Sequence, residues 1–120
     1  MVRSAEEFKK RTKQFALRTI RLVDSLPRTT AGRHIGGQLL RSGTSVGSNY
    51  RAACRARSSA EFCAKLGIVE EEADESVYWM ELLIEGELMK EHLLSSLLRE
   101  ENEILAMVIA SITTARRRKD

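Results

Sequence analysis

The sequence has few residues that interrupt a helix and no apolar run long enough to span a membrane. Pro27 is its only proline, so long helices can run without a break on either side of it. The longest apolar run covers residues 104–110, far short of the ~20 residues that a membrane-spanning helix needs. The first residues are polar and basic and lack the apolar stretch of a secretory signal. We therefore expect a cytoplasmic protein with no membrane segment.

Cysteine and histidine are also scarce, which argues against several kinds of metal site. Cys54 and Cys63 are too few for a disulfide framework and lack C-x-x-C spacing, so we expect free thiols in a reducing compartment. Neither His34 nor His92 has a glutamate three residues before it, so the Glu-x-x-His motif of di-iron bundles is absent. We expect neither a metal nor a cofactor.

The motifs of common enzyme classes are missing as well. Residues 37–45 resemble a phosphate-binding loop only faintly, because the glycines are too widely spaced and no lysine follows the second one. Ser45 has no recognisable partners for nucleophilic catalysis. The acidic stretch 70–75 is typical of a solvated or salt-bridged helix face. We therefore expect no enzymatic activity.

The residues that are present favour four amphipathic helices in one domain of residues 1–120. Apolar residues recur at helical spacing, and no useful length alternates with the period of two that marks a strand. Short links between long helices favour antiparallel neighbours. The predicted fold class is therefore all-α, an antiparallel up-down four-helix bundle. Its predicted helices cover approximately residues 4–26, 30–56, 59–86 and 95–116.

Capping boxes mark two of the predicted helix starts. Ser4 precedes Glu7 by three residues, and Ser58 precedes Glu61 by the same interval. The third segment then carries the strongest periodic signal, in which apolar or small residues step alternately by four and three. The members of this heptad seam are Phe62, Leu66, Val69, Ala73, Ser76, Met80 and Leu83.

The second segment is rich in glycine, which weakens an isolated helix by about 0.8–1 kcal/mol at each position. A loop at residues 42–45 is the alternative, but the apolar period continues across the glycines and favours a helix. Gly43 and Gly47 are one turn apart, a spacing that lets another backbone approach closely. We expect these two glycines, and the region of Tyr78 and Trp79, to lie in close helix–helix or subunit contacts.

Charge is divided unevenly along the chain. Residues 1–57 carry 13 Lys/Arg against 3 Asp/Glu, a net +10, whereas residues 58–120 carry 7 against 14, a net −7. One explanation is structural, with basic helices paired to acidic ones inside a protomer or across a subunit contact. The other is a basic surface for nucleic-acid phosphates. Its candidate residues are Arg41, Arg51, Arg55, Arg57, Arg116, Arg117, Arg118 and Lys119.

Three stretches carry a longer pattern: residues 41–51 (RSGTSVGSNYR), Glu61-Phe62, and residues 65–83 (KLGIVEEEADESVYWMELL). Together they resemble a bacterial four-helix-bundle family that includes proteins encoded by intervening sequences within large-subunit ribosomal RNA genes. The resemblance covers about residues 8–112 and implies an up-down bundle that commonly assembles as a ring-like homopentamer. It also implies distant kinship with the accessory protein of diversity-generating retroelements, a basic pentamer that binds nucleic acid and a reverse transcriptase.

Two functions follow from these observations. The first is a non-enzymatic homo-oligomer that associates with RNA or DNA through the basic surface of its first two helices. Because aromatic residues make up only 5% of the chain, base stacking is not expected to dominate, and structured RNA or duplex fits better. The alternative is a protein-interaction scaffold that docks a partner such as a reverse transcriptase or a ribosomal factor. Exposed Tyr78 or Trp79 would support it.

Overall fold

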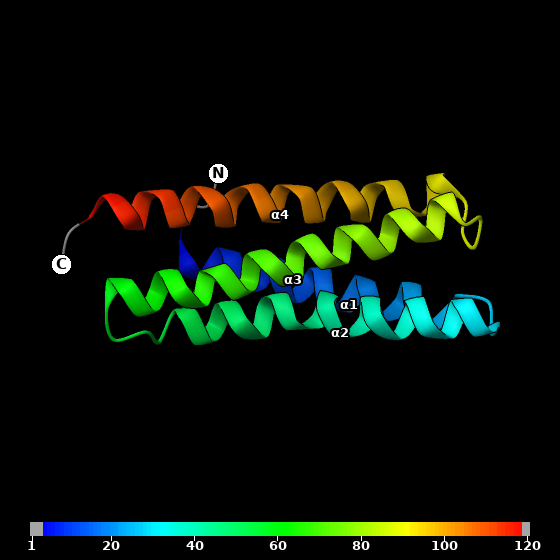
Figure 1. The fold of residues 1–120 in the computed structure, drawn as a ribbon, viewed down its shortest axis with the longest axis horizontal. Coiled ribbons are helices and arrows are strands. Elements are labelled where there is room, and N and C mark those ends of the chain that lie inside the picture. The colour runs from blue at the N-terminus through cyan, green and yellow to red at the C-terminus, as the bar shows by residue number, and fades with distance from the viewer. Residues whose placement is uncertain (1–3, 119–120) are drawn as a thin grey trace.

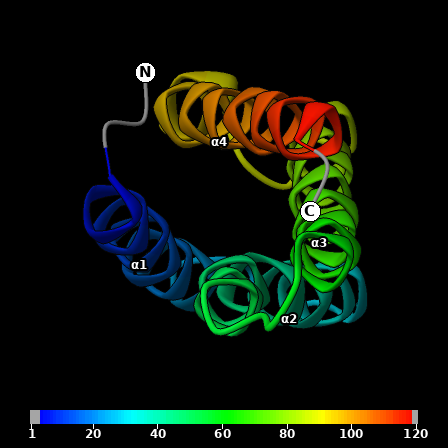
Figure 2. The same ribbon diagram turned by 90° about the vertical axis from the view of Figure 1, so that its left-hand side faces the viewer.

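The computed structural model describes residues 4–118, and these form four α-helices and no strand. Successive helices run in opposite directions, and each packs beside the next one in the chain (Figures 1 and 2). The predicted class, an all-α antiparallel four-helix bundle, is therefore confirmed. The helices are α1 (Ala5–Asp24), α2 (Thr30–Ala53), α3 (Ser59–Glu85) and α4 (Glu91–Arg117).

Side-chain caps explain where α1 and α3 begin. The Ser4 hydroxyl accepts the backbone N–H of Glu7, and the Ser58 hydroxyl accepts that of Glu61, each at 3.1 Å. Each bond satisfies a backbone donor that has no partner within its own helix. In contrast, α4 begins at Glu91, earlier than the predicted residue 95, and the residue before it makes no side-chain cap. No local signal marks that boundary in the sequence.

The glycines of α2 bring this helix close to α1. The helix continues without a break through residues 42–45, so the loop alternative is wrong. A Cβ atom on Gly43 would lie 2.9 Å from Cγ2 of Thr19, and one on Gly47 would lie 3.1 Å from Oγ1 of Thr12. Both glycines therefore serve a helix–helix contact inside the chain. Their missing side chains leave room for the threonines of α1.

The core is a continuous apolar layer to which each helix contributes one stripe. The heptad seam of α3 is buried as predicted, except for Phe62, which is half-buried. In α4, Leu98 and Leu105 lie half-buried at the edge of the apolar stripe. Its buried members are Leu94, Leu97, Glu101, Ile104, Val108, Ile112 and Ala115. Within residues 4–118, no helix is long and apolar enough to cross a membrane.

The side of the bundle between α1 and α4 is the most sparsely packed of its four sides. Polar side chains bridge it instead. Arg18 donates to the hydroxyl of Ser96 at 2.9 Å, and Arg11 donates to the carboxylates of Glu100 and Glu103. The connection between the first and last helices thus depends on ion pairs more than on apolar contact.

Candidate nucleic-acid interface

Two of the basic side chains are neutralised inside the protomer. Arg11 donates from Nε and Nη2 to the two carboxylate oxygens of Glu100 at 2.7 and 2.8 Å, and from Nη2 to Glu103 at 2.5 Å. Arg41 of α2 donates to the carboxylates of Glu72, at 3.1 Å, and Glu75. Part of the charge division is therefore structural, since α1 is paired to α4 and α2 to α3 at these points.

Arg41 belongs to a polar and aromatic cluster on α2 and α3. Glu75 also accepts the indole N–H of Trp79 at 2.9 Å, and this bond, followed by Arg41, holds the pKa of Glu75 below its usual value. The Trp79 ring meets His34 edge-on at 6.0 Å and Tyr78 at 5.1 Å between centroids. Tyr78 is 52% exposed. A phosphate would have to compete with two carboxylates for Arg41, which sets this residue apart from the other candidates.

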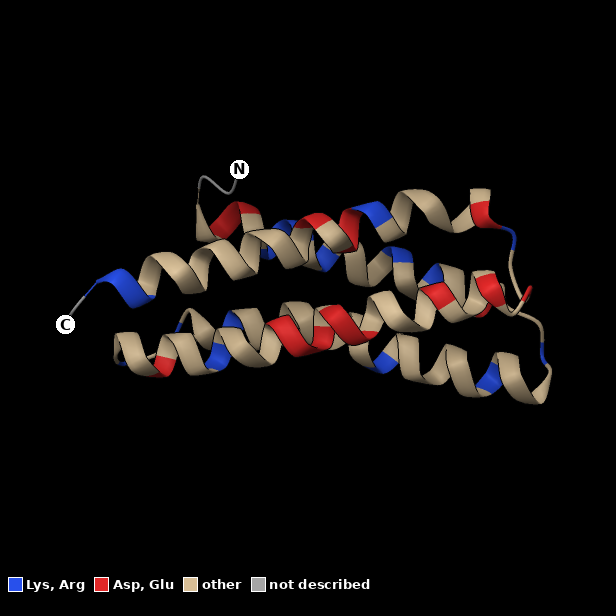
Figure 3. Cartoon of the chain, turned by 45° about the horizontal axis from the view of Figure 1, so that its top comes forward, with Lys and Arg blue, Asp and Glu red and all other residues tan. Residues whose placement is uncertain are grey.

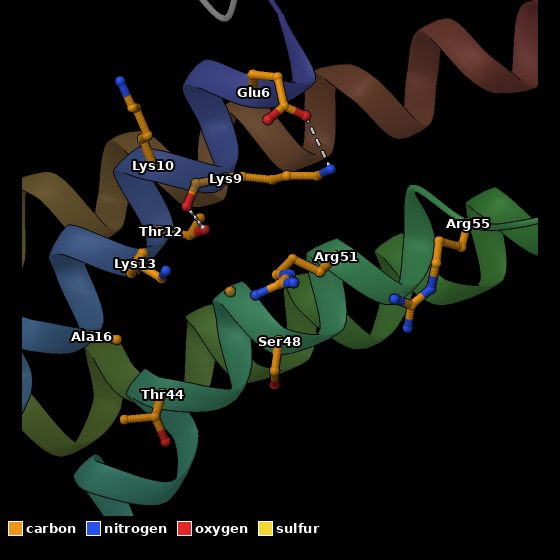
Figure 4. Close-up of a pocket in the computed structure, with 11 residues that line it drawn as sticks. Glu6, Lys9, Lys10, Thr12, Lys13, Ala16, Thr44, Ser48, Arg51 and Arg55 are labelled. Atoms are coloured by element: carbon orange, nitrogen blue, oxygen red, sulfur yellow. Dashed lines mark hydrogen bonds and ion pairs between the residues drawn. The ribbon is translucent and has the colours of Figure 1, made fainter.

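A basic groove lies between the first turns of α1 and the last turns of α2 (Figure 4). Its volume is about 710 Å³, five Lys or Arg residues line it against one carboxylate, and no aromatic residue does. The positive charge therefore meets a surface suited to phosphates more than to bases. The lining residues are Glu6, Lys9, Lys10, Thr12, Lys13, Ala16, Thr44, Gly47, Ser48, Arg51 and Arg55.

Both walls of this groove present cations. Lys9 and Lys13 come from α1, Arg51 lies on α2 and Arg55 just beyond its end, while Lys10 stands farther from α2 at the rim (Figure 4). Lys9 pairs with Glu6 at 3.1 Å, but the Glu6 side chain is 82% exposed, so this pair is weak. The other four cations make no ion pair within residues 4–118. The groove therefore keeps most of its charge available.

The remaining predicted cations lie at the same end of the bundle but at another corner. Arg57 is in the link between α2 and α3, and residues 116–118 end α4. The hydroxyl of Ser59 donates to the carbonyl of Ala115 at 3.4 Å, which holds the start of α3 against the end of α4. Residues 57 and 116–118 are exposed, and Lys119 lies outside the described residues.

Most acidic residues occupy a different region. They lie on the middle of α3, on the middle of α4 and near the turn from α3 to α4, while Glu6 and Glu7 lie in the first turn of α1 (Figure 3). The bundle thus presents a basic end and an acidic ridge. This distribution agrees with a basic binding surface on α1 and α2.

Three lysines of the groove, Lys9, Lys10 and Lys13, were not among the residues predicted from sequence. The groove depends on which helices are neighbours and on their register, and composition reveals neither. One signal was available: Lys9 and Lys13 are four residues apart in the first predicted helix, and Arg51 and Arg55 are four residues apart in the helix predicted over residues 30–56. Matching cation pairs on helices predicted to be adjacent would have indicated a shared surface.

A buried polar layer crosses the middle of the bundle. Glu101 of α4 is 0% exposed, and neither of its carboxylate oxygens has a hydrogen-bond partner among residues 4–118. Near it, the hydroxyl of Ser76 on α3 donates to that of Ser42 on α2 at 3.0 Å, and both serines are buried. Burial raises the pKa of Glu101 to about 8; the charge of Glu100 adds to the shift and the nearby Ser76 hydroxyl opposes it. The carboxyl is therefore mostly protonated at neutral pH.

The described residues contain no group of three or more His, Cys, Asp or Glu side chains placed to hold a metal ion. Cys54 and Cys63 are both free and half-buried.

Fold and surface together define a class, a four-helix bundle with a basic groove between its first two helices. Residues 6–110 match the family described as 23S rRNA-intervening sequence protein, and the chain belongs to this family. A similar solved structure is a protein of unknown function from the S23 ribosomal protein family of Bacteroides thetaiotaomicron VPI-5482. It is 34% identical, with a TM-score of 0.82 over 91% of this chain and 97% of that one. No curated protein matches the sequence.

Proposed function

We propose that this protein is a non-enzymatic, homo-oligomeric bundle that associates with structured RNA or duplex nucleic acid through the basic surface of α1 and α2. The observation that carries the proposal is the groove, in which five cations face one exposed carboxylate. Phosphate backbones bind such surfaces without regard to base sequence, and they release counterions when they do. Membership of a family described by intervening sequences of 23S rRNA makes structured RNA the first ligand to test.

A homo-oligomer would bind nucleic acid more tightly than a single protomer. A single protomer carries a net charge of only +3 and one groove, so we expect it to bind weakly. A homopentameric ring, the assembly that the family resemblance implies, would present the groove five times. A ligand that reaches several grooves then gains avidity without any new kind of contact.

The test is the binding of a labelled RNA stem–loop and a DNA duplex, measured by fluorescence anisotropy at about 50 and 200 mM salt. We expect tight binding at the lower salt concentration and a steep loss of affinity at the higher one. An absence of binding at both concentrations would reject the proposal and would mean that the basic half of the chain serves internal pairing.

The second candidate function is a protein-interaction scaffold, and exposed Tyr78 beside half-buried Trp79 on α3 favours it. Tyr78 is 52% exposed and packs edge-on against Trp79. Aromatic residues are enriched at protein interfaces. Capture of one defined partner by the wild-type protein, lost on Tyr78→Ala while RNA binding is kept, would favour this function over the first.

A further inference from the structure

The two walls of the groove carry different cations, and their arrangement indicates which part of a nucleic acid the groove can bind. Lysines form the α1 wall and arginines form the α2 wall. A lysine ammonium acts as a point charge, whereas a guanidinium can bind two phosphate oxygens at once. Arg51 lies in the last turn of α2, and Arg55 follows two residues after the helix ends. The two walls thus present several cations that can contact consecutive phosphates of a nucleic-acid backbone.

The floor of the groove is closed and has no group that could stack on a nucleic-acid base or donate a hydrogen bond to it. Gly47 lies against Thr12 of α1, whose side chain is 1% exposed, so the two helices meet directly beneath the groove. The hydroxyl of Thr12 donates to backbone carbonyls of its own helix, as does that of Thr44. A base inserted here would find neither an aromatic ring to stack on nor a free hydrogen-bond donor at the floor. The groove is therefore suited to the sugar–phosphate backbone.

We propose that the groove holds consecutive phosphates of one nucleic-acid strand, with Lys9 and Lys13 contacting them from α1 and Arg51 and Arg55 from the α2 side. This inference deepens the proposed function and rests on it. Lys10, at the rim, makes a smaller contribution. In the complex, a phosphate replaces Glu6 as the partner of Lys9, because an exposed pair of this kind gives little stability.

The experiment compares the salt dependence of binding for the wild type, the double variant Lys9→Gln/Lys13→Gln, and a matched control. The control, Arg33→Gln/Lys90→Gln, removes two exposed cations at the far end of the bundle and changes the net charge equally. Thermal unfolding verifies that each variant is folded. Loss of two phosphate contacts makes the salt dependence shallower: the magnitude of the slope of log K against log salt falls by about 1.8 on duplex and about 1.4 on single strands. The control keeps the wild-type slope.

Inorganic polyphosphate, a phosphate chain without bases, is the second probe. It should displace RNA from the wild-type protein and bind the Lys9→Gln/Lys13→Gln variant more weakly. RNA binding with an unchanged slope in this variant would overturn the groove assignment and leave the proposed function standing. Lysine-dependent polyphosphate binding without RNA binding would support the phosphate site and reject the proposed function.

Discussion

Arg11 of α1 and Glu100 of α4 form a two-pronged ion pair, with N–O distances of 2.7 and 2.8 Å, across the most sparsely packed side of the bundle. Both side chains are partly buried, with 31% and 20% of their surfaces exposed. Such pairs are stronger than ordinary surface ion pairs because the geometry is fixed and water is partly excluded. The first and last helices are therefore joined at a point where apolar contact is slight.

Replacement of Arg11 should loosen this side of the molecule. We expect Arg11→Ala to lower the free energy of unfolding by about 1–2 kcal/mol, since it leaves the partly buried Glu100 without its partner. Urea denaturation followed by circular dichroism measures the change. Arg33→Ala, which removes an exposed arginine without an ion pair in the described residues, serves as the control and should be close to neutral. Equal stability of the two variants would contradict the importance of this pair.

The buried carboxyl of Glu101 predicts a stability that depends on pH. Its pKa is raised in the folded state to about 8, so the folded chain binds a proton that the unfolded chain has already released. This contribution is complete below the unfolded pKa of about 4.3 and is lost as the pH rises toward 8. We expect the free energy of unfolding to fall across this range, by roughly 1.4 kcal/mol per pH unit at most.

Glu101→Gln isolates this effect, because it keeps the shape of the side chain and every other titrating group. Urea denaturation at several values from pH 5 to pH 8.5 should give a flatter stability profile for the variant than for the wild type. Parallel profiles would show that the burial of Glu101 has no energetic consequence.

The contact between Gly43 and Thr19 predicts opposite effects of the same substitution at two glycines of α2. Gly43→Ala places a Cβ atom 2.9 Å from Thr19, which is fully buried and hydrogen-bonded to the carbonyl of Phe15, and should destabilise the bundle by about 1–2 kcal/mol. Gly37→Ala meets nothing within 4 Å and should stabilise it by about 0.5–1 kcal/mol. Thermal unfolding of both variants measures the difference. A stabilised Gly43→Ala would mean that α1 and α2 can move apart at little cost.

Nucleic-acid binding should distinguish Arg41 from Arg51. Arg41 is held by the carboxylates of Glu72 and Glu75, whereas Arg51 makes no ion pair within residues 4–118 and lines the groove. We expect Arg51→Gln to weaken RNA binding several-fold and Arg41→Gln to leave it nearly unchanged. Fluorescence anisotropy at about 50 mM salt compares them. A larger loss for Arg41→Gln would move the binding surface toward α3.

The fold was predictable from sequence because its determinants are local. The capping box of Ser58 and Glu61 and the heptad seam of α3 each specify a boundary or a face on their own. The start of α4 was misplaced because the residue before Glu91 supplies no cap.

The candidate site was less predictable, because it depends on the pairing of elements. Arg41 and Arg51 lie on one helix and are chemically identical, and only their neighbours on α3 and α1 separate a neutralised cation from an available one. Glu101 was not singled out from the sequence, although it falls on the apolar stripe between Leu97 and Ile104. Closer attention to that spacing would have identified the buried carboxyl.

The most direct test of the account is sedimentation velocity of the protein mixed with a fluorescent RNA stem–loop, at about 50 and 200 mM salt. It reports the mass of the assembly and the fraction of RNA bound to it in one experiment. We predict a species several times heavier than the 13.6 kDa chain that carries RNA at the lower salt concentration and has largely released it at the higher one. A monomer beside free RNA at both concentrations would contradict the account.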